Sequence, residues 1–300
     1  MKKWNLIIDV AKCENCNNCM LTTRDEHVGN DFPGYAAPQP VHGHYWIKVE
    51  RKVRGEGAMV DAAYRPTTCN QCDNAPCIAK AGDGSVYKRP DGVVIIDPVK
   101  AKGRRDIVGS CPYGAIWWNE ELQLPQKWIF DAHLLDQGWK QPRCVQSCPT
   151  GVFKAVCIED EEMQEIVKKD KLEVLRPDLK TKPRVYYRNL YRYNKCFIGG
   201  TVVAEVKGLI ESIPGAEVTL KRNKVSIASL QTDAFGDFKF DQLDPNSGDY
   251  QVEISHPTLG TAVVNVSLAE SLYIGTIKVG QKGGGVFNIA TNRKELTPAS

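Results

Sequence analysis

The segment CENCNNCMLTT, residues 13–23, decides how the N-terminal part of the chain is interpreted. It contains Cys13, Cys16 and Cys19 in the spacing C-x2-C-x2-C. Thiols spaced this tightly are typical of metal ligation. The place where a fourth cysteine would complete the run holds Thr23. The segment therefore supplies three ligands, and the site needs a fourth from elsewhere in the chain.

A second cysteine run and two isolated Cys-Pro dipeptides supply what the first run lacks. The segment CNQCDNAPC contributes Cys69, Cys72 and Cys77, and the dipeptides begin at Cys111 and Cys148. A [4Fe-4S] cluster needs four thiolates, and one loop with a remote Cys-Pro can provide them. Three ligands plus one, twice, predict two [4Fe-4S] clusters. Structural zinc is the alternative, but it usually takes two separated C-x2-C pairs or adds histidine.

Charge and cysteine usage limit the class of protein. The 300 residues suffice for two domains and carry 39 basic and 36 acidic side chains, so charge gives no general case for a nucleic-acid partner. No run of 18 or more apolar residues predicts a transmembrane segment. The start, MKKWNLIIDVAKC, fits a first β-strand better than a signal peptide, which favours a cytoplasmic protein. Eleven cysteines, an odd number in tight groups, favour ligation over disulfides.

The part before residue 198 alternates cysteine runs with short elements. Residues 86–97 predict a hairpin around Pro-Asp-Gly, and residues 159–175, acidic first and basic last, predict a surface helix. The basic, tyrosine-rich residues 176–195 predict a strap whose tyrosines pack on the cluster domain or on a partner. Base stacking on those tyrosines would be the nucleic-acid alternative, which the near-neutral charge disfavours.

Residues 199–280 have a different character. Seven short β-branched runs, separated by Gly, Asn, Asp and Pro, predict a seven-stranded β-sandwich or barrel. All eleven cysteines precede this part, and it has no catalytic constellation. The glycine-rich start of residues 281–300 predicts a flexible tail.

The chain resembles the four-cluster ferredoxin-type subunits of molybdopterin oxidoreductases, such as dimethyl sulfoxide reductase and respiratory nitrate reductase. More narrowly, it is similar to the small subunits of pyrogallol–phloroglucinol transhydroxylase and resorcinol hydroxylase. The cysteine spacing carries the wider resemblance. The narrower one rests on segments over nearly the whole chain: IDVAKCENCNNC, DEH, YRPTTCNQCDNAPC, DGVVIIDP, CPYGAIWWNE, AHLLD, TKPRVYYRNLYRY and, in the β domain, DAFGDFKFDQL.

The resemblance implies the fold and the pairing of the ligands. We expect an α+β, tandem bacterial-ferredoxin-like domain in residues 1–198 followed by the all-β domain. In the wider family the first cysteine run pairs with the fourth and the second with the third. One cluster is then expected on Cys13, Cys16, Cys19 and Cys148, and the other on Cys69, Cys72, Cys77 and Cys111.

The chain departs from the four-cluster pattern at seven places, all within the same two quartets. One quartet reads Thr23, Trp128, Asp131 and Cys144, and the other reads Ala81, Ala101, Arg104 and Ile107. The two retained clusters correspond to the first and third positions in the family's line of clusters. A lone Cys144 cannot hold a cube, and Cys157 and Cys196 are interpreted as ordinary buried thiols.

The resemblance implies a redox subunit without a catalytic site of its own. Its expected partner is a large subunit that binds a bis-pterin guanine dinucleotide molybdenum cofactor, absent from this chain, and that hydroxylates or transhydroxylates polyhydroxylated benzenes in anaerobic degradation. A higher-order oligomer of such heterodimers stays open. The alternatives are an electron-transfer subunit of a respiratory molybdenum enzyme, or a docking subunit whose clusters mainly hold the fold together. We interpret His27, His42, His44 and His133 as structural or interfacial.

Overall fold

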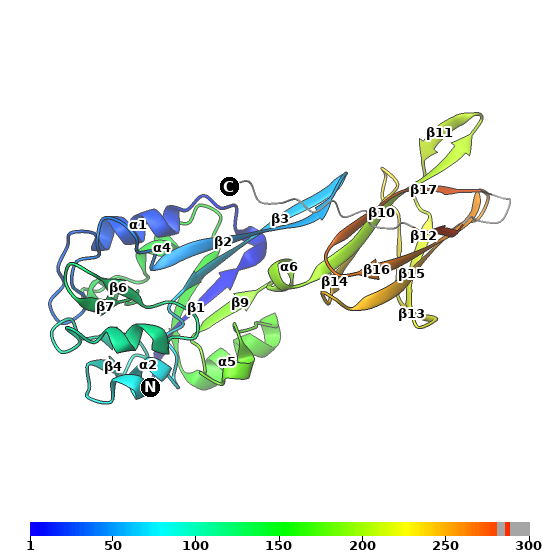
Figure 1. The fold of residues 1–300 in the computed structure, drawn as a ribbon. Coiled ribbons are helices and arrows are strands. Elements are labelled where there is room, and N and C mark those ends of the chain that lie inside the picture. Colours follow the sequence, from blue (N-terminus) through cyan, green and yellow to red (C-terminus); the bar gives the residue numbers. More distant parts are fainter. Residues whose placement is uncertain (281–285, 289–300) are drawn as a thin grey trace. The chain divides into compact units, whose positions relative to one another are not determined.

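The computed structural model describes residues 1–280 and 286–288, and the chain divides into two compact units (Figure 1). The first unit comprises Met1–Lys52 and Ala63–Tyr193. The second comprises Val53–Ala62 and the chain from Asn194 onward. The segment Val53–Ala62 is the tip of a hairpin formed by β2 (Ile47–Glu56) and β3 (Met59–Thr68). The sequence suggested a single cut at residue 198 and did not anticipate that this tip belongs with the second unit.

A three-stranded sheet organises the first unit (Figure 1). Its central strand β1 (Lys3–Asp9) pairs antiparallel with β8 (Phe153–Ile158) and parallel with β9 (Val185–Arg188). Its apolar side chains point alternately to two faces. Ile7 packs with Met163 of α5 (Asp160–Asp170), whereas Leu6 and Ile8 belong to the main core of the unit. The predicted N-terminal strand and surface helix are therefore both present, the helix somewhat shorter than predicted.

Short elements in the loops around this sheet carry the cysteines. The predicted hairpin at residues 86–97 forms as β4 and β5. The remaining elements of the first unit are η1 (Val10–Lys12), α1 (Asn18–His27), α2 (Pro76–Ala81), β4 (Val86–Lys88), β5 (Val94–Ile96), η2 (Arg105–Ser110), β6 (Trp117–Asn119), β7 (Leu124–Gln126), α3 (Ala132–Asp136), α4 (Arg143–Gln146), η3 (Pro177–Leu179) and α6 (Tyr191–Asn194), where η marks a 3-10 helix.

The predicted strap is more deeply embedded than a surface segment. Within it, Val185–Arg188 is strand β9, and Tyr187 is fully buried with its hydroxyl donating to the Pro66 carbonyl at 3.1 Å. Tyr186 is buried against the α5 side of the sheet. The tyrosines thus pack within the first unit, because the parallel pairing of β9 with β1 covers the sheet edge.

The second unit has two sheets around one apolar core. In one, β10 (Cys196–Val206) pairs with β11 (Leu209–Ser212), β14 (Asp237–Leu243) and β17 (Leu272–Val279). The other has the order β13-β12-β15-β16-β18. Its strands are β12 (Glu217–Arg222), β13 (Val225–Gln231), β15 (Gly248–His256), β16 (Gly260–Leu268) and β18 (Val286–Asn288). Side chains of both sheets, including Ile198, Val202, Val252 and Val264, share the core.

All seven predicted runs of this unit are strands, and β11 was missed. The four residues of β11 are all exposed, so they lack the alternation of buried and exposed side chains that marks a strand in sequence. Of the predicted flexible tail, three residues form β18, and the rest lies outside the described residues. None of the helices in residues 1–280 and 286–288 has the length and apolar character needed to span a bilayer.

A buried cation lies in the second unit near the hairpin tip. The Arg54 guanidinium donates to the Asp241 carboxylate at 3.0 Å and also pairs with Asp61. It lies over the Phe197 ring, with its central carbon 5.4 Å from the ring centroid. These contacts compensate the burial of the charge, which would otherwise cost several kcal/mol.

Candidate metal centres

The first cysteine run wraps around a point between η1 and α1. Asp9 ends β1 and caps η1, where its carboxylate accepts from the Ala11 backbone N–H at 3.1 Å. Asn15 and Asn17 then adopt left-handed backbone conformations, with φ of 60° and 61°. Asparagine tolerates this conformation better than most residues. The alternation of Asn and Cys in this run therefore gives a tight loop on which Cys13, Cys16 and Cys19 gather.

Cys148 approaches the same point from the chain after α4. Its thiol and those of Cys13, Cys16 and Cys19 are electrostatic neighbours. The Val152 backbone N–H donates to the Cys148 sulfur at 3.3 Å, which would stabilise a thiolate there. Burial, followed by the neighbouring thiols, raises the pKa of Cys19 to about 12, so the apoprotein holds it as a thiol at neutral pH. Cys19 is buried and Cys16 exposed, so this group opens to solvent on the Cys16 side.

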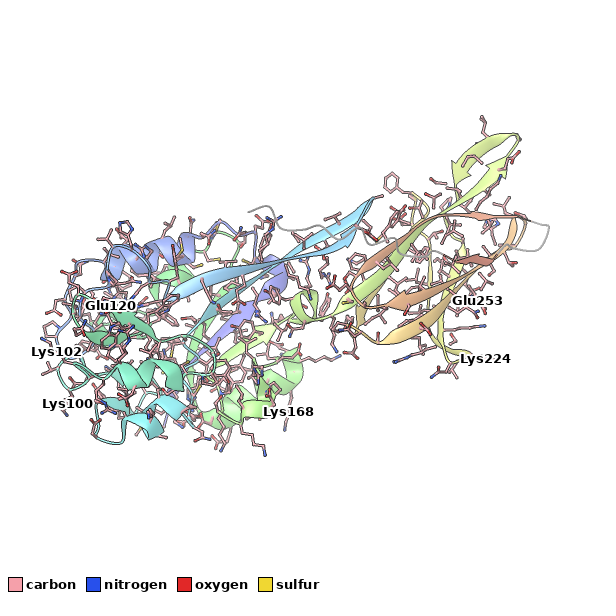
Figure 2. All side chains as sticks on the ribbon, viewed as in Figure 1. Lys100, Lys102, Glu120, Lys168, Lys224 and Glu253 are labelled. Atoms are coloured by element: carbon pink, nitrogen blue, oxygen red, sulfur yellow. The ribbon has the colours of Figure 1, made fainter. Side chains whose placement is uncertain are left out.

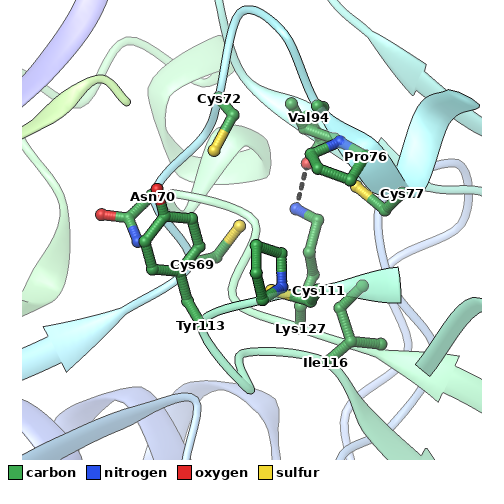
Figure 3. A pocket seen from close by; sticks show the side chains of 12 residues that line it. Cys69, Asn70, Cys72, Pro76, Cys77, Val94, Cys111, Tyr113, Ile116 and Lys127 are labelled. Atoms are coloured by element: carbon green, nitrogen blue, oxygen red, sulfur yellow. Dashed lines mark hydrogen bonds between the residues drawn. The ribbon is translucent and has the colours of Figure 1, made fainter. Parts of the chain in front are cut away.

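The second cysteine run lines a small hollow (Figure 3). Cys69 and Cys72 follow the end of β3, and Cys77 lies in the first turn of α2, after Pro76. Cys111 reaches the hollow from the end of η2. Burial and the neighbouring thiols raise the pKa of Cys72 to about 12 and that of Cys77 to about 11. The other lining residues are Asn70, Ala75, Pro76, Val94, Pro112, Tyr113, Ile116 and Lys127.

The two groups are too widely spread for a single metal ion. Four thiolates around one zinc, at about 2.3 Å from the metal, would lie within about 4 Å of one another. Among the described residues, no three His, Cys, Asp or Glu side chains converge closely enough to hold an ion. At the second group, a hollow with thiols around its wall fits a larger inorganic group instead. The donor set is all sulfur, which suits an iron–sulfur cluster.

The structure fills the place of one lost cysteine quartet with a buried polar network. The Asp131 carboxylate, fully buried, accepts from Trp128 Nε1 at 3.0 Å, from the Arg143 backbone N–H at 2.9 Å and from His27 Nε2 at 3.3 Å. Burial alone would raise the pKa of Asp131, but these donors, led by His27, hold it below its ordinary value. Cys144 lies beside this carboxylate and is fully buried.

Thr23 completes this quartet from α1. Its hydroxyl donates to the Cys19 carbonyl at 2.8 Å and is buried. Trp128 and Cys144 belong to the same apolar core as Cys19. An indole ring, a hydrogen-bonded carboxylate and a threonine hydroxyl are thus buried at three of the four places of this quartet.

The other lost quartet is filled mainly with apolar side chains. Ala81, Ala101 and Ile107 are buried together with Cys72 and Cys77 of the second cysteine run. Arg104 donates to the Ala81 carbonyl at 3.3 Å and turns its charge outward to Asp83 and Asp106. Apolar packing and a surface ion pair therefore replace the second missing set of ligands.

Comparison with known proteins agrees with these observations. Residues 60–158 match the model of a 4Fe-4S dicluster domain, and residues 198–274 match a carboxypeptidase regulatory-like domain. The chain is 46% identical over 257 residues to the pyrogallol hydroxytransferase small subunit of Pelobacter acidigallici, which covers 85% of this chain and 91% of that protein. The chain belongs to the iron–sulfur small subunits of molybdopterin oxidoreductases. An iron–sulfur domain followed by a β-rich domain is therefore its established architecture.

More distant relatives come from other enzymes of the same family. A tetrathionate reductase subunit of Salmonella typhimurium is 30% identical, over 63% of this chain and 73% of that protein. A putative dimethyl sulfoxide reductase iron–sulfur subunit of Halobacterium salinarum is 27% identical, over 63% of this chain and 80% of that protein. Small subunits of this kind imply a large catalytic partner.

The remaining cysteines and histidines of the small subunit lie away from the two groups of thiols or have structural partners. Cys196 is buried as predicted, but Cys157 on β8 is only half-buried, because it lies at the outer end of that strand. His27 and His133 pair with carboxylates. Of the other two histidines interpreted from the sequence, His44 donates from Nε2 to the Trp118 carbonyl, 2.9 Å away, and His42 is exposed.

Two features of the small subunit were missed from sequence. The Asp131 network depends on segments more than 100 residues apart, which no local pattern reveals. Lys127 lines the second hollow with an almost fully buried side chain. A lysine within the apolar run LPQKWIF, directly before one of the lost cysteine places, is a signal that would have singled it out.

Proposed function

We propose that this small subunit holds two [4Fe-4S] clusters in a ferredoxin-like domain. Cys13, Cys16, Cys19 and Cys148 would hold one cluster, and Cys69, Cys72, Cys77 and Cys111 the other. The observation that supports this most is the grouping of these eight thiols into two sets of four. When bound, each cluster would accept and release one electron.

The chain's own residues would hold and shield these centres. Raised pKa values of the buried thiols mean that proton release must accompany ligation. The Val152 N–H would donate to the ligating sulfur of Cys148. Burial of Cys69, Cys72 and Cys77 would exclude water from the second centre, and hydrogen bonding, burial and nearby charge together set a cluster's potential.

The electrons would pass to or from a large molybdopterin subunit that hydroxylates or transhydroxylates polyhydroxylated benzenes. This substrate class follows from the similarity to the pyrogallol hydroxytransferase small subunit, which exceeds that to the respiratory subunits. The large subunit would carry a bis-pterin guanine dinucleotide cofactor, and heterodimers could assemble further. The dense group of unpaired thiols supports a cytoplasmic location, where thiols stay reduced.

The two proposed clusters would not form an uninterrupted wire. They correspond to the first and third positions of the family's line of four, and the Asp131 network fills a place between them in that order. We expect slow electron transfer between them. Rapid electron transfer from one reduced cluster to the other, followed by freeze-quench electron paramagnetic resonance (EPR) after mixing with a reductant, would contradict this part of the proposal.

Paired cysteine variants test the ligand assignment. In the anaerobically purified complex, Cys148→Ala and Cys111→Ala should each alter or lose one EPR signal and leave the other intact. Cys144→Ala, the matched control, removes a buried thiol that is not assigned as a ligand and should keep both signals. Loss of a signal in Cys144→Ala, or its retention unchanged in Cys148→Ala, would refute the assignment. Centres that never change redox state during turnover would favour the docking role instead.

A further inference from the structure

Lys127 places an ammonium group at the second hollow. The residue follows β7 and lines the hollow together with Cys69, Cys72, Cys77 and Cys111 (Figure 3). Only 2% of its surface is exposed. Its ammonium donates to the carbonyl of Val94, and that of Trp128 lies 3.3 Å away. Two backbone carbonyls thus fix the position of the charge.

No carboxylate neutralises this charge within the part of the chain that the structure describes. The ion pairs there include Lys88, which lies near the same hollow and pairs with Asp73 at 2.9 Å, but none involves Lys127. A buried ammonium without a counter-charge costs several kcal/mol, even when it donates hydrogen bonds. Neutral carbonyls compensate only part of that cost. The site must therefore offer negative charge from another source.

The cysteines around the hollow would be that source once they are thiolates that ligate a cluster. Burial raises the pKa of Cys77 and Cys111, and the positive charge of Lys127 partly opposes this by lowering the pKa of both thiols. At the first group of thiols, by contrast, the charged side chain that acts on Cys13 is Glu14, which raises its pKa. The two groups therefore differ in the sign of the nearby charge. A nearby positive or negative charge changes the reduction potential of a cluster, because the charge of the cluster changes when it is reduced.

We propose that Lys127 raises the reduction potential of the cluster held by Cys69, Cys72, Cys77 and Cys111. This inference rests on the proposed function, because it needs a cluster at that site. Reduction adds one electron to the cluster and neither forms nor breaks a bond. A cluster with four thiolates is already negative, so the added electron is stabilised by the nearest buried cation. Lys127 is thus a residue that tunes the centre, not a ligand.

Charge-changing variants of Lys127 separate tuning from structure. Lys127→Met keeps the length of the side chain and removes its charge, whereas Lys127→Gln keeps a donor for the Val94 carbonyl. Lys127→Arg keeps the charge. Lys102→Met is the matched control, since Lys102 is exposed in the same unit and its charge is screened by water (Figure 2). All variants are prepared anaerobically in the whole complex, and their iron is counted before titration.

The readout is the midpoint potential of each cluster, from a redox titration monitored by EPR. The signal that Cys111→Ala alters identifies the relevant cluster. In Lys127→Met and Lys127→Gln that cluster should shift to a more negative potential, with full iron and an unchanged second cluster. Lys127→Arg should return towards wild type, and Lys102→Met should match it.

Full iron with no shift, or a shift to more positive potential, would overturn the inference and leave the proposed function intact. Iron loss in both uncharged variants would also overturn it, because Lys127 would then be required for structure. If the wild-type protein itself lacked the cluster that Cys111→Ala affects, the proposed function would fail first. The potential, rather than turnover, decides each case.

Discussion

Replacing Asp131 with alanine should destabilise the iron–sulfur unit strongly. The substitution leaves three donors without an acceptor: Trp128 Nε1 and His27 Nε2, both buried, and the part-buried Arg143 N–H. Each unpaired donor costs about 1–3 kcal/mol. Asp131 also has a φ of 50°, where alanine costs about 1 kcal/mol more than aspartate or asparagine. Allowing for partial relaxation, we expect a loss of about 4 kcal/mol in the free energy of unfolding.

Asp131→Asn is the matched control for this prediction. Its side-chain oxygen can still accept from Trp128 and His27, and asparagine tolerates the left-handed backbone, so only the contact with the Arg143 N–H is lost. We expect a cost of about 1–2 kcal/mol. Urea unfolding under nitrogen, monitored by tryptophan fluorescence and by the visible absorbance of the clusters, measures both variants.

The expected shifts are well separated. With a slope of about 2 kcal/mol per molar urea, the midpoint should fall by about 2 M in Asp131→Ala and by less than about 1 M in Asp131→Asn. Equal shifts in the two variants would show that the three donors find other partners. The network would then not be what stabilises the place of the lost cluster.

Substitutions at three further positions test other parts of the structure. Ile107→Ala should lose about 2–4 kcal/mol by opening a cavity beside the second cysteine group, and Ile107→Val about 1 kcal/mol, both read from urea midpoints. Arg54→Met removes the buried cation that pairs with Asp61 and Asp241, and only the Lys239 ammonium, 3.7 and 3.4 Å away, then remains beside them. The variant should cost about 3 kcal/mol by calorimetry, whereas a loss under about 1 kcal/mol would contradict a structural role. Burial lowers the pKa of His133, so the unfolded chain takes up a proton below about pH 6.5 more readily than the folded chain does. The free energy of unfolding should therefore fall as the pH drops from about 7.5 to about 5.5, and it should fall less steeply in His133→Gln. Equal slopes in the two proteins would refute this.

The sequence predicted what depends on local spacing. The two cysteine runs and the two Cys-Pro dipeptides could be named from their spacing, whereas the resemblance to the family indicated which dipeptide joins which run. The strands of the second unit follow the alternation of buried and exposed side chains, as in β15 and β16. The hairpin of β4 and β5 follows from its Pro-Asp-Gly turn.

What depends on distant contacts could not be read from the sequence. Strand β9 lay hidden in a basic, aromatic segment, because its parallel partner β1 is nearly 180 residues away. The acceptor role of Asp131 exists only because α1 and the start of α4 bring His27 and Arg143 to it. The buried position of Lys127 could not be predicted either, because it depends on a hydrogen bond to the Val94 carbonyl of another hairpin.

The two quartets that depart from the four-cluster pattern are occupied by side chains of different character. One place became a buried polar network around Asp131, the other an apolar patch around Ile107. At both places the residues that stand where the wider family has cysteines are mostly buried. A cluster in either place would require the repacking of Trp128 or of Ile107, both fully buried.

Iron and acid-labile sulfide per chain, measured with EPR on the anaerobic complex, test the central claim most directly. The iron of the large subunit is determined separately and subtracted. Two [4Fe-4S] clusters in this chain predict eight irons, eight sulfides and two reduced-cluster signals. Twelve or sixteen irons would show that a place filled by Trp128 and Asp131, or by Ile107, still holds a cluster. Four irons would show that one of the two groups of cysteines holds none.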